Sequence, residues 1–112
     1  MQSTEQKIER AALAGLAAAS MDERERSTDI SLAELAALVE TAGGQPVVTL
    51  LQNKPTPDPR TFLGEGKVAE LRELIVANDC DLAVFDNELS PSQMRVLEEE
   101  LGVRVLDRSG LI

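Results

Sequence analysis

Two residue types that carry much of enzyme chemistry are nearly missing from this chain, which has no histidine and a single cysteine. Without histidine, neither a Ser-His nor a Cys-His nucleophile pair can be built, and a His-containing zinc site is excluded. The single Cys80 excludes an internal disulfide and a cysteine-rich metal site. Because no cluster of basic residues accompanies it in the sequence, we interpret Cys80 as a small packing residue.

Aromatic residues and long apolar runs are also scarce. Two Phe are the only aromatic residues, so Ala, Leu and Val must build the core of this 112-residue chain. A chain of this length forms one domain or a piece of a larger protein. No apolar run is long enough to span a membrane, and Ala11–Ala19 is too short and too poor in Leu and Ile for a signal peptide. We therefore expect a soluble, cytoplasmic protein with no membrane contact.

Positive charge is the third shortage, since the formal net charge is −9. That value argues against an autonomous, non-specific nucleic-acid binder, which would be basic. Residues 1–51 carry four basic and eight acidic side chains, and residues 73–112 carry three and nine. Residues 52–72 carry four basic and three acidic side chains, a net +1, and are the only part of the chain that is not acidic.

Periodicity and capping residues predict three helices. The first is Ser31–Ala42, where Ser31 and Glu34 form a capping box and Gly43-Gly44 ends the helix. The second follows Gly64-Glu65-Gly66-Lys67 and runs to about Asn78. The third follows a second capping box at Ser90-Pro91-Ser92-Gln93 and stops at Gly102.

Short β-branched or apolar runs predict strands at Pro46–Leu51, Leu82–Phe85 and Val103–Leu106, and prolines make Lys54–Pro59 an extended loop. The stretch Ile8–Ala19 is ambiguous, because its alanine content favours a helix while its small apolar residues also suit a strand buried on both faces. If it is a strand, strands and helices alternate. The fold class is then α/β, with a small, mainly parallel four-stranded sheet, helices on its faces and βαβ units.

The two ends of the chain carry separate expectations. Residues 1–7 are polar, and we expect a disordered N-terminal tail followed by one domain over residues 8–112. Asp107-Arg108-Ser109 resembles the start of a further helix, which suggests a fragment that ends at that helix. Apolar surface exposed by a helix cut in its first turn would favour a homodimer of the fragment.

The turn Gly64-Glu65-Gly66-Lys67 is the strongest candidate for a binding site, because backbone N–H groups at a helix start and a lysine together suit an anion. A P-loop requires G-x-x-x-x-G-K-[ST], but Val68 follows the lysine and Thr61 stands at the position of the first glycine. Three interpretations remain: a tight turn into a helix, a contact with RNA phosphate made with Lys67 and Arg60, or a weak nucleotide site.

A polar loop, Asp86-Asn87-Glu88, follows the predicted strand Leu82–Phe85. The carboxyl ends of strands in open α/β sheets are where ligands bind, and a magnesium site is conceivable there. The alternative, which we favour, is a polar loop in which Asp86 or Asn87 caps the turn.

The segments TFLGEGKVAEL and DLAVFDNELSPSQMRVLEEELGVRVLDRSGLI, in this order and spacing, resemble the N-terminal domain of the HflX family of ribosome-associated GTPases. The resemblance extends over SLAELAALVETAGG and the strand after it, so that it covers roughly residues 8–112. The alanine-rich first strand and the charged loop after it depart from the family pattern.

The resemblance implies a larger protein in which this domain precedes a helical hairpin and a GTPase domain that binds GTP and Mg²⁺. It implies binding to the large ribosomal subunit and a role in ribosome splitting or rescue. The fragment itself would be non-catalytic and without cofactor. Ribosomal RNA contacts would then come from Lys54, Arg60, Gly64, Gly66 and Lys67. The alternative is an intramolecular regulator that packs on the hairpin and the GTPase domain.

Overall fold

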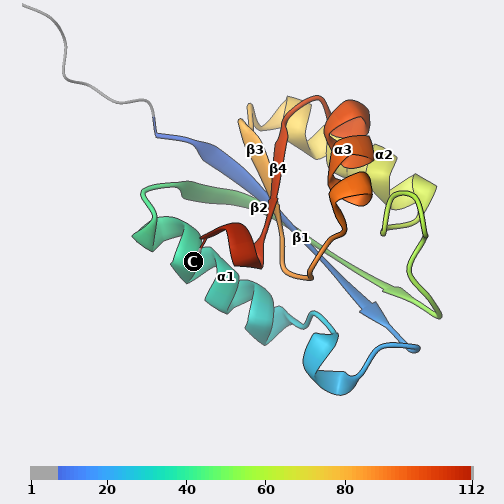
Figure 1. Ribbon diagram of the computed structural model, residues 1–112. Helices are drawn as coiled ribbons and strands as arrows, with labels where there is room; N and C mark the ends of the chain where they lie inside the picture. The colour runs from blue at the N-terminus through green and yellow to red at the C-terminus, as the bar shows by residue number, and fades with distance from the viewer. Residues whose placement is uncertain (1–7, 112) are drawn as a thin grey trace, which may run out of the picture.

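Strands and helices alternate along the chain in the computed structural model, which describes residues 8–111 (Figure 1). The strands are β1 (Arg10–Ala18), β2 (Gln45–Lys54), β3 (Leu82–Phe85) and β4 (Arg104–Asp107). The α-helices are α1 (Asp29–Thr41), α2 (Glu65–Ala77) and α3 (Pro91–Leu101), with 3-10 turns η1 (Glu23–Glu25) and η2 (Arg108–Leu111). The strands pair in the order β2-β1-β3-β4, and every pair is parallel. The predicted α/β fold is confirmed, while the predicted tail, residues 1–7, lies outside the described residues.

The ambiguous segment Ile8–Ala19 contains the strand β1, which lies in the interior of the sheet. It pairs with β2 on one side and with β3 on the other. Its side chains alternate between two cores, with Ala12 and Ala14 in one and Ala11 and Leu13 in the other. Small residues are required here, because a Cβ at Gly15 would lie 2.0 Å from Oγ of Ser27. Burial on both faces therefore outweighs the helix propensity of alanine.

The helices cover the two faces of the sheet unequally (Figure 1). α1 packs on one face through Leu32, Leu35 and Val39. α2 and α3 pack together on the other face, where their buried apolar residues are Val68, Leu71, Ile75, Leu97 and Leu101. Met94 of α3 is half-buried and packs against this core. None of the described helices combines the length and apolar character needed to cross a membrane.

The predicted start of the first helix was wrong. α1 begins at Asp29, and its N-cap is Thr28, whose Oγ1 accepts a bond from the Ser31 amide at 3.0 Å. Ser31 Oγ in turn accepts a bond from the Thr28 amide at 2.7 Å, so Ser31 is the N3 residue of the capping box and not its N-cap. A serine hydroxyl here takes the place that Glu or Gln usually fills, and this hid the motif from the sequence pattern.

Four other segments differ from their predicted bounds. α2 begins at Glu65, so Glu65, Gly66 and Lys67, which were expected before the helix, belong to its first turn. β2 runs from Gln45 to Lys54, longer than Pro46–Leu51, because its polar end pairs with Leu16–Ala18 of the long strand β1. The extended loop therefore begins at Pro55 and not at Lys54. β4 starts and ends one residue later than predicted. The capping box at Ser90 and the stop of α3 at Gly102 are both as predicted, and Gly102 adopts a left-handed conformation.

Candidate functional site

The end of β2 and the start of α2 meet around Gly64. The amide of Gly64 donates to Oε1 of Gln52 at 2.9 Å. A Cβ at Gly64 would lie 3.1 Å from Nε2 of Gln52 and 3.6 Å from Nζ of Lys54. Lys54 and Gln52 therefore extend over the first residues of α2, and a side chain at position 64 would crowd both.

The first turn of α2 is open. Gly64 is the N-cap and provides no side-chain cap, and the first helical hydrogen bond runs from the Val68 amide to the Gly64 carbonyl at 3.0 Å. Gly66 faces open space, with no atom within 4 Å of a Cβ built on it. Uncapped amides at a helix N-terminus carry partial positive charge and favour anions. Glu65 in the same turn reduces this preference.

The other two candidate cations already have acidic neighbours. Arg60 lies 3.6 Å from Glu100 of α3, and Lys67 lies 3.0 Å from Glu70 within α2. Both pairs are exposed, so each stabilises the fold by less than about 1 kcal/mol and can open for a stronger partner. The structure thus brings Lys54 and Gly64 together, places Lys67 one turn away and directs Arg60 toward α3.

The loop between β2 and α2 is held by local bonds. Asp58 Oδ1 accepts from the amides of Arg60 and Thr61 at 2.8 and 3.1 Å. The amide bonds from Thr61 and then from Arg60 lower the pKa of the Asp58 carboxyl. Phe62 has a φ of 67° and a buried side chain, and a bond from the Leu63 amide to the Thr61 carbonyl closes a tight turn around it. These bonds and the fixed φ angles of three prolines together define the conformation of the chain before α2.

Asn87 in the polar loop after β3 forms hydrogen bonds with buried backbone groups of β1. The Leu16 amide donates to Oδ1 of Asn87 at 2.8 Å, and Nδ2 of Asn87 donates to the carbonyls of Leu16 and Glu25, both at 2.9 Å. Asn87 thus extends the pairing of β1 beyond the end of β3, whereas Glu88 is exposed. Among residues 8–111, no three Asp, Glu or Cys side chains lie close enough to hold a metal ion.

Asp86 joins three separate segments. Its Oδ2 accepts from the hydroxyls of Ser27 and Ser31, each at 2.6 Å. Its Oδ1 forms an ion pair with Arg108, which also donates to the Ser31 carbonyl at 2.9 Å. Asp86 therefore ties η2 to the start of α1. It borders a hollow of about 640 Å³ that is lined by α1, by η2 and by the loops after β1, β2 and β3.

Two residues of these sites were missed by sequence reasoning. Gln52 is one of several polar residues of β2, and no local pattern distinguishes it from the others. Arg108 lies in a segment that we interpreted only as a helix start. Each acquires its role from a residue distant in the sequence, Gly64 for Gln52 and Asp86 for Arg108.

Comparisons with known proteins identify the family. The sequence profile of the family described as GTP-binding GTPase N-terminal matches residues 29–112. GTPase HflX of Alkalihalophilus pseudofirmus is 45% identical over 82 residues, which are 73% of this chain and 19% of that protein. GTPase HflX of Escherichia coli is 40% identical over 81 residues, or 72% and 19%. The chain thus spans about a fifth of the length of these relatives.

A solved structure shows the same fold. The crystal structure of a GTP-binding protein from the hyperthermophilic archaeon Sulfolobus solfataricus in complex with GDP matches with a TM-score of 0.64 at 19% identity, over 93% of this chain and 29% of that one. The profile match and the sequence identities together show that the chain belongs to the HflX GTPase family and corresponds to its N-terminal domain.

Proposed function

We propose that this domain docks an HflX-type GTPase on the large ribosomal subunit, in the cytoplasm, for ribosome splitting or rescue. The chain itself is non-catalytic in this proposal. GTP and Mg²⁺ belong to a GTPase domain of the longer protein, which agrees with the missing P-loop hydroxyl at Val68. Family membership and the relatives' greater length support this division of work.

The observation that carries the docking site is the meeting of Lys54 and Gln52 with the open first turn of α2. An ammonium group, an amide and uncapped backbone N–H groups are the donors that contact phosphate oxygens in nucleic-acid interfaces. Gly66, with open space around its Cα, leaves room for a phosphate to approach these donors. Lys67 and Arg60 would join the contact when their exposed pairs with Glu70 and Glu100 open.

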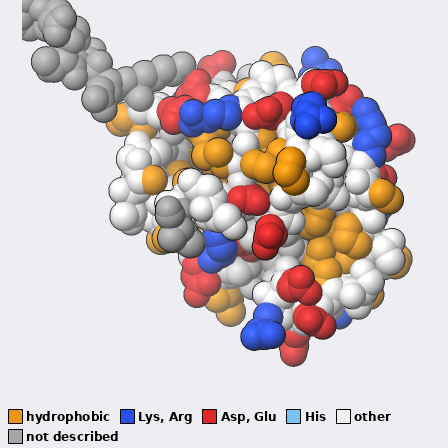
Figure 2. All heavy atoms as spheres, in the orientation of Figure 1, with side chains coloured by type: hydrophobic (Ala, Val, Ile, Leu, Met, Phe, Trp, Pro, Cys, Tyr) orange, Lys and Arg blue, Asp and Glu red, His pale blue; other side chains and the backbone are white. Residues whose placement is uncertain are grey.

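The net charge of −9 is compatible with this contact, because the local potential at the interface decides binding. Figure 2 shows acidic side chains spread over the face that carries α1 and β4, interspersed with basic ones. Residues 52–72, which include the docking site, have a net charge of +1. The acidic surfaces would then face away from RNA or toward other domains of the protein.

Ribosome binding by the full-length protein tests the site. Reversal of Lys54, Arg60 and Lys67 to Glu should weaken binding to the large subunit. Each lost phosphate contact should also lower the slope of log K against log salt by about one unit. Arg95→Glu, an exposed charge reversal on α3, is the matched control and should leave the slope unchanged.

The same variants separate docking from the alternative, an intramolecular regulator. Docking predicts altered ribosome affinity with an unchanged basal GTPase rate, whereas regulation predicts an altered rate without ribosomes. If the triple variant keeps both the affinity and the salt slope of the wild type, the proposed site is wrong.

A further inference from the structure

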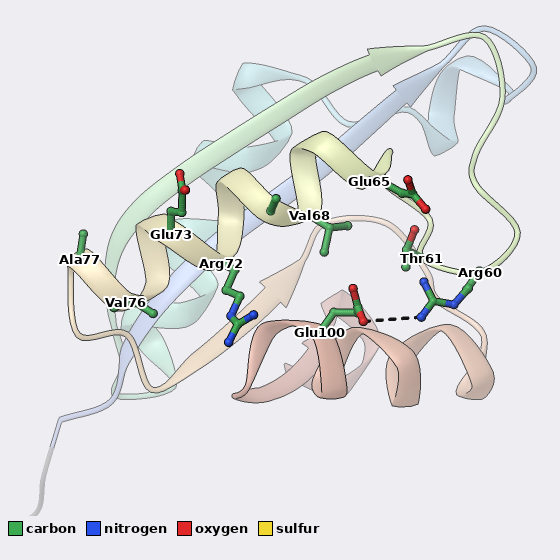
Figure 3. A pocket seen from close by; sticks show the side chains of 10 residues that line it. Arg60, Thr61, Glu65, Val68, Arg72, Glu73, Val76, Ala77 and Glu100 are labelled. Atoms are coloured by element: carbon green, nitrogen blue, oxygen red, sulfur yellow. Dashed lines mark ion pairs between the residues drawn. The ribbon is translucent and has the colours of Figure 1, made fainter.

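A groove of about 590 Å³ lies between α2, α3 and the loop before α2 (Figure 3). Two adjacent rows of α2 border it, each with a spacing of four residues. The valine row is Val68, Arg72 and Val76, which point toward α3, and the alanine row is Ala69, Glu73 and Ala77. Val76 is 69% exposed, so a large apolar side chain on this face lies in water.

The two charges in the middle of these rows have no partner in the described part of the chain. Neither Arg72 nor Glu73 forms an ion pair or hydrogen bond there. The positions three and four residues away from Arg72 are all apolar, and Glu73 has no cation at these distances. Lys67, one turn earlier, does pair with Glu70 of the same helix. The other arginine of the groove, Arg60, pairs with Glu100 on the opposite wall.

We propose that this face of α2 binds the same face of a second copy of the chain, about a two-fold axis parallel to the helix. Such an axis lays the valine row of one copy beside the alanine row of the other. Each Arg72 then meets Glu73 of the second copy, and each Val76 meets Ala77 of the second copy. Large residues face small ones and opposite charges face each other, twice in each interface.

The pattern favours a second copy over an unrelated partner because α2 itself carries both halves of the contact. The alanine row offers the small residues and the acidic charge that fit the valine row. The contact involves little more than one face of a 13-residue helix. It therefore falls at the small end of specific interfaces, and we expect a weak dimer with a Kd between about 10 µM and 1 mM. Arg60 also lines this groove, but Lys54, Gly64, Gly66 and Lys67 do not, so Arg72→Glu and Glu73→Arg test the dimer without altering the proposed phosphate contact.

Sedimentation velocity on the 112-residue chain, measured up to about 1 mM protein, tests the dimer over the expected range. The wild type should show a rising sedimentation coefficient. Arg72→Glu and Glu73→Arg should each weaken the dimer at least tenfold, because each places like charges opposite one another. The double variant Arg72→Glu/Glu73→Arg should recover dimerisation, since the swap restores opposite charges. Far-UV circular dichroism checks that every variant is folded.

Arg95→Glu on α3 is the matched control and should dimerise like the wild type. A monomer at every concentration overturns the proposal, and so does a dimer that survives either single reversal or is not rescued by the swap. If the wild type is monomeric and Arg72→Glu lowers ribosome affinity, the groove belongs to the ribosome contact and the dimer is excluded.

Discussion

At the scale of single residues, one side chain replaces a strand. β1 continues past the end of β3, so the backbone of Leu16 would lack a partner on that side. The carboxamide of Asn87 provides both an acceptor and a donor to Leu16, as a neighbouring strand would. Since Leu16 is fully buried, water cannot take over this role.

Asn87→Ala should destabilise the domain by about 2 kcal/mol, because it leaves the buried Leu16 amide unpaired. Urea unfolding followed by circular dichroism measures this loss. Glu88→Ala, at the exposed neighbouring position, should change stability by less than about 0.5 kcal/mol. If Asn87→Ala were as stable as Glu88→Ala, the hydrogen bonds between Asn87 and Leu16 would contribute nothing to the stability of the domain.

At the scale of elements, the loop between β2 and α2 depends on an ionised carboxylate. The amide bonds from Thr61 and Arg60 favour the charged form of Asp58 and lower its pKa. A carboxyl whose pKa is lower in the folded state stabilises the fold above its unfolded pKa of about 3.9. That contribution disappears as the pH falls through the folded pKa.

The difference in Tm between the wild type and Asp58→Asn should therefore be constant above about pH 5 and shrink as the pH falls below the unfolded pKa of about 3.9. Thermal unfolding at a series of pH values measures it. Asp22→Asn, which removes an exposed carboxylate outside this loop, controls for the general effect of acid. If the Tm difference between the wild type and Asp58→Asn widened toward low pH, the amide bonds would not be the cause of the lowered pKa of Asp58.

At the scale of the whole molecule, charge opposes folding. Twenty acidic side chains face eleven basic ones, and the ion pairs of Arg60, Lys67 and Arg104 are exposed. Exposed pairs contribute little, whereas the repulsion of a net charge of −9 acts over the entire compact state.

Raising NaCl from about 20 to about 200 mM should therefore raise the urea midpoint of the domain, since it shortens the Debye length from about 20 Å to below 10 Å. Glu99→Gln at an exposed position of α3 should raise the midpoint at low salt and reduce the salt effect. A midpoint that falls with salt would mean that the ion pairs outweigh the repulsion.

The sequence predictions were accurate where the interacting residues lie close together in the sequence, and they failed where these residues are far apart in it. α3 was predicted at both ends because Ser90, Pro91 and Gly102 act on backbone groups within four residues of themselves. α1 started two residues earlier than predicted because the third cap position holds a serine in place of Glu or Gln. For the candidate sites, the sequence located Lys54, Gly64 and the loop after β3 but did not reveal their partners.

The sequence by itself determined the order of helices and strands after residue 30, the caps of α3, the glycines at the start of α2 and the family, since all of these reside in local patterns. The tertiary structure decided that Ile8–Ala19 is the strand β1, because only burial between two helical layers outweighs the helix propensity of alanine. It also decided that Asp86 and Asn87 hold the interior together, through bonds between residues as far as 71 positions apart. The turn Gly64-Glu65-Gly66-Lys67 was already a candidate phosphate contact in the sequence, and the fold added Gln52 to it and set Lys54 close to Gly64.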